Sequence, residues 1–160
     1  MRLYLIRHGK ARRQSPTGLD EDRSLAARGR EQAAWLGGEL REGENPPERV
    51  LCSPAARALE TAGLLGEGLG LEVEVEERLS LRTTASAVVE LIGSLEGVGA
   101  VALVGHNPTL SVVADVLCEG VTGGGGTELR TGEAAVIEVL EMGDVVGKAE
   151  FVELLRAETL

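Results

Sequence analysis

The strongest constraint on the fold is a run of five apolar residues, Ala100 to Val104, which ends at a glycine. A short continuous apolar run with such an ending is typical of a fully buried strand. A helical pattern follows it from Pro108 to Leu117. Because a buried strand followed by a helix is the building unit of α/β proteins, this segment predicts a sheet covered by helices.

The same alternation of strand and helix extends along most of the chain. Strands are expected at residues 2–7, 49–52, 71–75 and 100–104, a polar loop at 10–24, and helices from Ala26 to Arg41, from Ser53-Pro54 to about Gly66, from Thr83 or Thr84 to about Leu95, and from Pro108 to Leu117. Residues 134–140 and 148–154 flank Gly143-Asp144 and predict a hairpin. We therefore expect an α/β sandwich whose sheet is mostly parallel and ends in a hairpin.

The length of 160 residues predicts one domain over residues 1–160. Residues Thr122 to Thr127 include four consecutive glycines. Because this stretch follows a helix instead of joining a strand to a helix, it predicts a flexible linker and not a phosphate-binding loop.

The net charge of −10, from 26 acidic and 16 basic residues, argues against nucleic acid and anionic lipid as partners. No apolar window reaches the roughly 18 residues expected of a membrane-spanning helix. The first residues, MRLYLIRHG, lack the apolar region of a signal peptide, and the only cysteines are Cys52 and Cys118. We expect a cytoplasmic protein with reduced thiols.

Polar side chains of one chemical kind follow three of the predicted strands. Arg7-His8 ends the first strand, Ser53 and Arg57 follow the second, and His106-Asn107 follows the strand at 100–104. Ligands of open α/β sheets bind beyond the carboxyl ends of the strands, so these clusters are expected to converge. A histidine or arginine taken alone is more often a surface or core residue, but both histidines of the chain occupy such positions.

Guanidinium groups and helix N-termini are suited to a phosphoryl group. An imidazole nitrogen can attack phosphorus to form a covalent intermediate, provided that it is unprotonated. Its other nitrogen would then donate to a backbone carbonyl, which fixes the tautomer. A second, protonated histidine would stabilise charge on the phosphoryl oxygens.

Three segments resemble the signature sequences of the histidine phosphatase superfamily. They are Arg7-His8-Gly9, Ser53-Pro54-Ala55-Ala56-Arg57-Ala58 with Thr61-Ala62, and Gly105-His106-Asn107-Pro108. The resemblance implies a three-layer α/β/α sandwich of the phosphoglycerate mutase-like type, with no metal and no cofactor. It implies that His8 is phosphorylated, that His106 supports the transferred group, and that Arg7, Arg57, His106 and Asn107 bind phosphate.

Many members of this superfamily carry a glutamate that protonates the leaving oxygen, whereas Leu81 occupies the corresponding position here. No carboxylate lies between Glu77 and Glu90, so Glu77 is the remaining candidate for the acid. General-acid help is worth about 10²–10⁴-fold, but a phosphoramidate can leave without it. In its missing acid and its short length, the chain resembles the small, SixA-like branch of the superfamily. This resemblance implies a phosphohistidine-bearing protein as the partner.

Other functions remain open at this stage. A small-molecule phosphomonoesterase would use the same pocket, and a non-catalytic phosphate-binding module would retain it without turnover. A cysteine phosphatase is excluded, because four residues separate Cys52 from Arg57 and that chemistry uses five. The sequence does not predict the oligomeric state.

Overall fold

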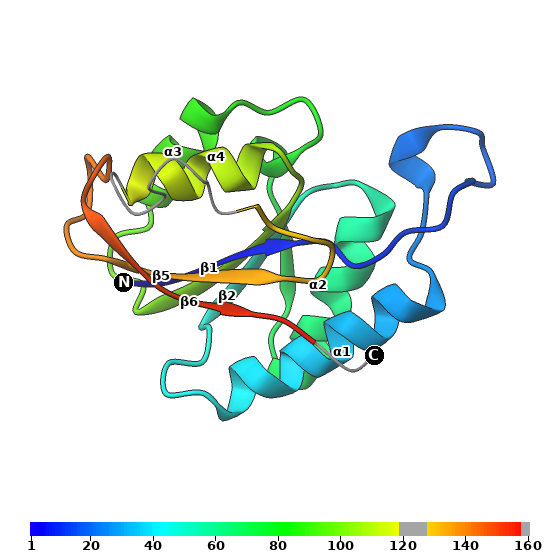
Figure 1. Ribbon diagram of the computed structural model, residues 1–160, viewed down its shortest axis with the longest axis horizontal. Coiled ribbons are helices and arrows are strands. Elements are labelled where there is room, and N and C mark those ends of the chain that lie inside the picture. The colour runs from blue at the N-terminus through cyan, green and yellow to red at the C-terminus, as the bar shows by residue number, and fades with distance from the viewer. Residues whose placement is uncertain (119–127, 158–160) are drawn as a thin grey trace.

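A computed structural model describes residues 1–118 and 128–157 as a six-stranded sheet with helices on both faces (Figure 1). The strands are β1 (Arg2–Arg7), β2 (Arg49–Cys52), β3 (Val73–Val75), β4 (Ala100–Gly105), β5 (Ala134–Val139) and β6 (Ala149–Leu155). The α-helices are α1 (Ala27–Glu42), α2 (Ala56–Leu69), α3 (Ala85–Gly93) and α4 (Thr109–Leu117), and the short 3₁₀ helices are η1 (Asp20–Asp22) and η2 (Glu77–Leu79).

The strand order is β3-β2-β4-β1-β5-β6. Strands β3, β2, β4 and β1 run parallel to their neighbours, whereas β5 is antiparallel to β1 and β6 is antiparallel to β5. This arrangement confirms the mostly parallel sheet and the terminal hairpin that the sequence predicts.

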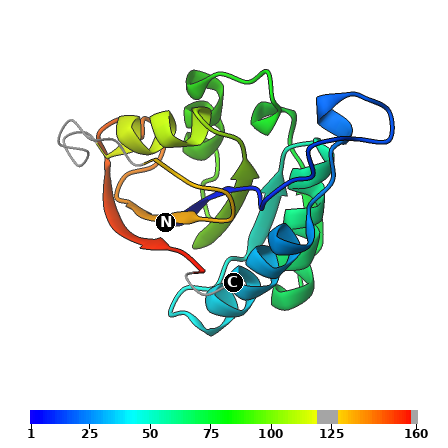
Figure 2. The ribbon, with the colours of Figure 1, turned by 45° about the vertical axis from the view of Figure 1, so that its right-hand side comes forward.

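Helices α1 and α2 cover one face of the sheet, and α3 and α4 cover the other (Figures 1 and 2). Strand β4 explains why both faces need cover, since all of its residues are buried. Val101 and Leu103 belong to the core beneath α3 and α4, whereas Ala102 and Val104 belong to the core beneath α1 and α2. Because successive side chains of β4 point to opposite faces of the sheet, this strand packs against both helical layers. The fold therefore has the three layers that the resemblance implies.

The register of the parallel strands aligns their carboxyl ends. Arg7 of β1 is paired with Gly105 of β4, and Cys52 of β2 is paired with Val104. The next residues along each strand are His8, Ser53 and His106, so the three predicted clusters share one edge of the sheet. The loop of residues 10–24 extends beyond this edge (Figure 1).

Helix α2 differs from its prediction at both ends. It begins at Ala56 and not at Ser53-Pro54, because the Ser53 hydroxyl bonds to His106 and accepts the Ala55 N–H instead of capping the helix. It continues to Leu69 and ends at Gly70, whose φ of 70° is in the left-handed region that glycine tolerates.

Most of the other boundaries agree with the prediction, and Thr84 caps α3 by accepting the Ala87 N–H.

Cys52 and Cys118 are free and buried, and burial raises the pKa of each thiol to about 11. The predicted glycine linker, Thr122 to Thr127, lies outside the described residues. Of the helices within residues 1–118 and 128–157, none is long and apolar enough to cross a membrane.

The start of α1 lies directly against the loop that follows β1. A Cβ atom built on Gly29 would lie 2.2 Å from the carbonyl oxygen of Lys10, and one on Gly9 would lie 2.6 Å from the carbonyl oxygen of Gly29. The Ala26 N–H donates to the Lys10 carbonyl at 2.8 Å. Glycine at both positions therefore allows helix α1 to fix the backbone beside His8.

We predict that Gly29→Ala destabilises the protein by about 2 kcal/mol, because the added methyl group forces backbone apart. Gly38→Ala, in the same helix, is the matched control, since a Cβ there meets nothing within 4 Å. It should stabilise the protein by up to about 1 kcal/mol through helix propensity. Guanidinium unfolding of both variants tests this, and an equal effect of the two would contradict the close contact.

Candidate active site

His8 follows β1 and is held in one tautomer from both sides. Its Nδ1 lies 2.7 Å from the Gly9 carbonyl oxygen, and its Nε2 lies 3.2 Å from Arg57 Nε. Because the guanidinium can only donate, Nε2 must accept, and the ring proton is therefore on Nδ1. This is the tautomer that the sequence argument requires, with a lone pair on Nε2.

The surroundings of His8 favour its neutral form. Burial is the largest cause, and the charges of Arg57, Arg7 and Arg23 act in the same direction, whereas the hydrogen bond to Gly9 opposes them. The net effect is a pKa of His8 that is lowered from 6.5 to about 4. The ring is only 7 % exposed, and at neutral pH it carries no charge.

His106 follows β4 and lies beside His8, with ring centroids 5.2 Å apart. Its Nε2 is 2.8 Å from the Ser53 hydroxyl. Burial is the largest cause that lowers the pKa of His106 to about 3, and its neighbours His8 and Arg57 act in the same direction because they disfavour a second positive charge. Burial and the neighbouring positive charges thus favour a neutral ring, in contrast to the protonated ring expected from the sequence, and a bound anion would raise the pKa of His106.

Arg57 lies in the first turn of α2 and is 4 % exposed. Besides its bond to His8, its guanidinium donates to the backbone and side chain of Asp20. Thr61, one turn further along α2, accepts the Gly9 N–H at 3.0 Å and donates to the Arg57 carbonyl at 2.7 Å. One helix therefore positions both the arginine and the backbone next to His8.

Arg7, at the end of β1, donates from Nη1 to the Leu129 carbonyl at 3.0 Å. Its Nε is buried and has no hydrogen-bond partner among the described residues, and the same holds for Nδ1 of His106. Buried polar atoms are nearly always paired in folded proteins. Two unpaired nitrogens among the predicted phosphate-binding side chains therefore point to an oxyanion as the missing partner.

Asn107 is engaged in holding the chain near α4. Its side-chain amide donates to the Leu129 carbonyl at 2.8 Å, and its side-chain oxygen accepts from the backbone N–H and the hydroxyl of Ser111. These bonds give Asn107 a structural role, and its contact with phosphate stays a prediction.

Asp20, on the loop between β1 and α1, is the site residue that the sequence argument missed. Its carboxylate is 2.9 Å from Arg57 Nη2 and 2.8 Å from Arg23 Nε. The hydrogen bond from Arg23, followed by that from Arg57, holds the pKa of Asp20 below its usual range. The sequence assigned residues 10–24 to a polar loop, and nothing in its spacing indicated that the loop returns to α2.

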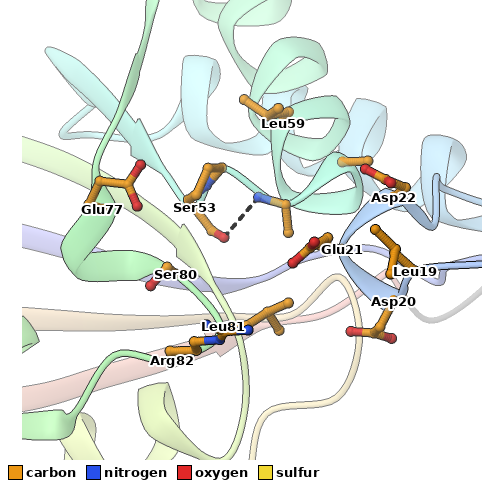
Figure 3. Close-up of a pocket in the computed structure, with 13 residues that line it drawn as sticks. Leu19, Asp20, Glu21, Asp22, Ser53, Leu59, Glu77, Ser80, Leu81 and Arg82 are labelled. Atoms are coloured by element: carbon orange, nitrogen blue, oxygen red, sulfur yellow. Dashed lines mark hydrogen bonds between the residues drawn. The ribbon is translucent and has the colours of Figure 1, made fainter. Parts of the chain in front are cut away.

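Glu77, the candidate acid, is exposed and lies on η2. Figure 3 shows it across an open groove from Glu21 and Asp20, on the side where Ser53 lies. It borders the site and, in the part of the chain that the structure describes, forms no hydrogen bond or ion pair with His8 or His106. Within the described residues, no three His, Cys, Asp or Glu side chains lie close enough together to hold a metal ion.

Comparison with known proteins agrees with this arrangement. The family model for the histidine phosphatase superfamily (branch 1) matches residues 3–80. An uncharacterized protein of Mycobacterium leprae is 34 % identical, over 96 % of this chain and 95 % of its own length. The chain belongs to the histidine phosphatase superfamily.

Comparison with solved structures shows which members of the superfamily this chain is similar to. The protein histidine phosphatase SixA, complexed with tungstate, matches with a TM-score of 0.85 and 26 % identity over 97 % of this chain and 96 % of that one. A mycobacterial glucosyl-3-phosphoglycerate phosphatase shares the fold, with a TM-score of 0.70 and 21 % identity over 94 % of this chain and 96 % of that one. The chain is thus a SixA-like member with a phosphoglycerate mutase-like fold.

We predict that Asp20→Asn strengthens the binding of inorganic phosphate roughly two- to fivefold, because a partly exposed carboxylate competes modestly for Arg57. Asp22→Asn is the control, since it changes the charge of the same 3₁₀ helix but Asp22 accepts from Thr17. Calorimetric titration with phosphate measures both. Weaker binding by Asp20→Asn would show that the carboxylate orients Arg57 more than it competes.

The buried histidines also predict a pH-dependent stability. Their folded pKa values of about 4 and about 3 lie below the ordinary 6.5, so the unfolded chain binds more protons as the pH falls. Between pH 7 and pH 5 the free energy of unfolding should decrease by about 2 kcal/mol per histidine. Urea unfolding across this range tests the slope, which His106→Gln should reduce by about half, and an unchanged stability would contradict it.

Proposed function

We propose that this protein is a phosphatase that acts through a covalent phosphohistidine intermediate on His8, and that it removes phosphate from phosphohistidine on a protein partner. The unprotonated Nε2 of His8, fixed by Gly9 and Arg57, is the observation that carries the proposal. Phosphatase activity is what the superfamily and its SixA-like structures support; the phosphohistidine substrate is the finer part of the proposal.

In the first step, the hydrogen bond from Arg57 Nε to His8 Nε2 breaks, and the freed lone pair of Nε2 forms a bond to phosphorus while the phosphorus–nitrogen bond of the substrate breaks. The bonding electrons pass to the substrate imidazole, whose other nitrogen carries a proton, so that it leaves as a neutral ring. In the second step, water attacks the phosphorus, the bond to His8 breaks, and its electrons return to Nε2. Inorganic phosphate and one proton are released.

Arg7, Arg57 and His106 are proposed to stabilise the phosphoryl oxygens. Arg57 has N–H groups beyond those that it uses for His8 and Asp20, and the Nε of Arg7 is unpaired. If Ser53 donates to Nε2 of His106, the proton of this ring is on the unpaired Nδ1. Each of the three residues then has an N–H group that donates to the phosphoryl oxygens while the phosphoryl group is transferred.

The choice of phosphohistidine depends on the absence of a positioned acid within residues 1–118 and 128–157. Asp20 is the carboxylate bonded to the site, and its two arginine partners keep it ionised, so it is a poor proton donor. An alkoxide leaving group needs such a donor, whereas the ring of phosphohistidine does not. SixA, which shares 26 % identity with this chain, is described as a protein histidine phosphatase.

A small-molecule phosphomonoesterase is the second candidate, and the position of Glu77 favours it. This carboxylate lines the groove beside Ser53 and would be the acid if it reached the leaving oxygen. The proteins that share the fold include the glucosyl-3-phosphoglycerate phosphatase. A non-catalytic phosphate-binding module is less well supported, because His8 has both the tautomer and the charge state of a nucleophile.

The free, buried thiols of Cys52 and Cys118 support a cytoplasmic location for this reaction.

The intermediate can be tested with a labelled phosphoramidate donor. Wild-type protein should acquire an acid-labile, base-stable label, and His8→Ala should acquire none, because the attacking nitrogen is gone. His106→Ala should still be labelled, but more slowly. Label that persists in His8→Ala would disprove the nucleophile assignment.

The substrate class is tested by Glu77→Gln. Hydrolysis of free phosphohistidine should stay within about twofold of wild type, because no acid is needed, whereas an acid role in monoester hydrolysis would cost about 10²–10⁴-fold. Both substrates are compared by kcat/KM. A sugar phosphate hydrolysed by the wild type far faster than phosphohistidine would favour the phosphomonoesterase instead.

A further inference from the structure

An open groove extends the candidate active site beyond the phosphate-binding side chains (Figure 3). It has a volume of about 870 Å³ and is lined by residues from the segments 19–22, 53–59 and 77–82. It is continuous with the site, since Ser53 bonds to His106 and Asp20 bonds to Arg57. This volume is that of a ligand site and far exceeds a phosphoryl group, so the groove can accommodate the part of the substrate that flanks the phosphate.

The groove has apolar walls that are exposed to water. Leu19, Leu59 and Leu81 are 53 %, 39 % and 41 % exposed. They are three of the eight large apolar side chains that are exposed among the described residues, and all three line this one groove. Exposed apolar side chains gathered beside a functional site are typical of a surface that binds a protein.

The groove is also strongly acidic. Its lining includes the carboxylates of Asp20, Glu21, Asp22 and Glu77 against one cation, Arg82. Among the described residues, Glu21 and Glu77 have no hydrogen bond or ion pair that would neutralise them. Figure 3 shows Glu21 and Glu77 on opposite sides of the groove.

From these observations we infer that the groove binds a polypeptide segment with a cationic side chain and an apolar side chain close to the phosphohistidine. This inference rests on the proposed function. The carboxylates attract a lysine or arginine of the substrate, and the leucines cover the apolar side chain. A small phosphorylated acid would instead bring its second negative charge against Glu21 and Glu77, which disfavours that class of substrate.

The arrangement separates two tasks within one site. Arg7 and Arg57 are held by backbone and Asp20 at the sheet edge, where they meet the phosphoryl group. The groove carboxylates lie further from the sheet edge, where they contact the residues that flank the phosphohistidine. A substrate with negative charge at its phosphate and positive charge beside it complements both regions at once.

Phosphohistidine peptides of one length test the inference. One set carries lysine, serine or glutamate next to the phosphohistidine, with a leucine kept constant, and a second set replaces the leucine by serine. At low salt, kcat/KM should be roughly tenfold higher with lysine than with glutamate, and the ratio should decrease as salt screens the charges.

The double variant Glu21→Gln/Glu77→Gln should bring the lysine-to-glutamate ratio close to one. The ratio is the readout because any general loss of rate cancels in it. The matched control is Glu44→Gln/Glu96→Gln, which removes the same charge from exposed positions before β2 and β4, at the opposite edge of the sheet. The control should keep the full ratio.

The apolar contact has its own variant. Leu81→Ala should reduce the preference for leucine over serine roughly threefold, which is the loss expected for a partly buried contact. Leu140→Ala, which truncates an exposed leucine after β5 that does not line the groove, should leave this preference unchanged.

Free phosphohistidine, which has no flanking residues, distinguishes a failure of the groove inference from a failure of the proposed function. If the protein hydrolyses it and the peptides but shows no preference among them, the groove inference is wrong and the proposed function stands. If it hydrolyses neither free phosphohistidine nor any peptide, the proposed function fails and the inference falls with it. A preference for glutamate would also overturn the inference.

Discussion

The hydrogen bond from Arg57 to Nε2 of His8 joins two segments that lie 49 positions apart, and the candidate site depends on it. It requires that β1 and β2 end at the same edge, which they do because each pairs in parallel with β4. It also requires that α2 start close to that edge, and the bonds of Thr61 to Gly9 and to the Arg57 carbonyl maintain this. The bond selects the reactive tautomer, and the burial that protects it lowers the pKa of the ring.

Much of this arrangement is present in local sequence patterns. The apolar runs at β1, β2 and β4 gave the strands, and the residue that follows each run gave His8, Ser53 and His106. The strand predictions succeed because a strand's burial and its endpoint depend mainly on neighbouring residues. The start of α2 is predicted too early, because a serine followed by a proline is typical of a helix start, and only the folded chain brings the Ser53 hydroxyl to His106.

Asp20 could not be predicted for a related reason. It lies in a loop whose path is determined by contacts with other elements: the bridge between Ala11 and Leu25, and the bonds of Arg23 to Asp20 and to the Arg12 carbonyl. None of these contacts has a periodic pattern. The charge state of His106 is a second such case, since it depends on burial and on positive charges contributed by other elements of the fold.

The bond between Asp20 and Arg57 has a consequence for the whole reaction cycle. A guanidinium that is 4 % exposed would be costly to leave without a negative partner. Because the loop of residues 10–24 supplies the Asp20 carboxylate, the proposed function has Arg57 exchange this carboxylate for phosphate as phosphate binds. In that proposal, the release of phosphate returns Asp20 to Arg57, so the buried guanidinium is not left without a negative partner.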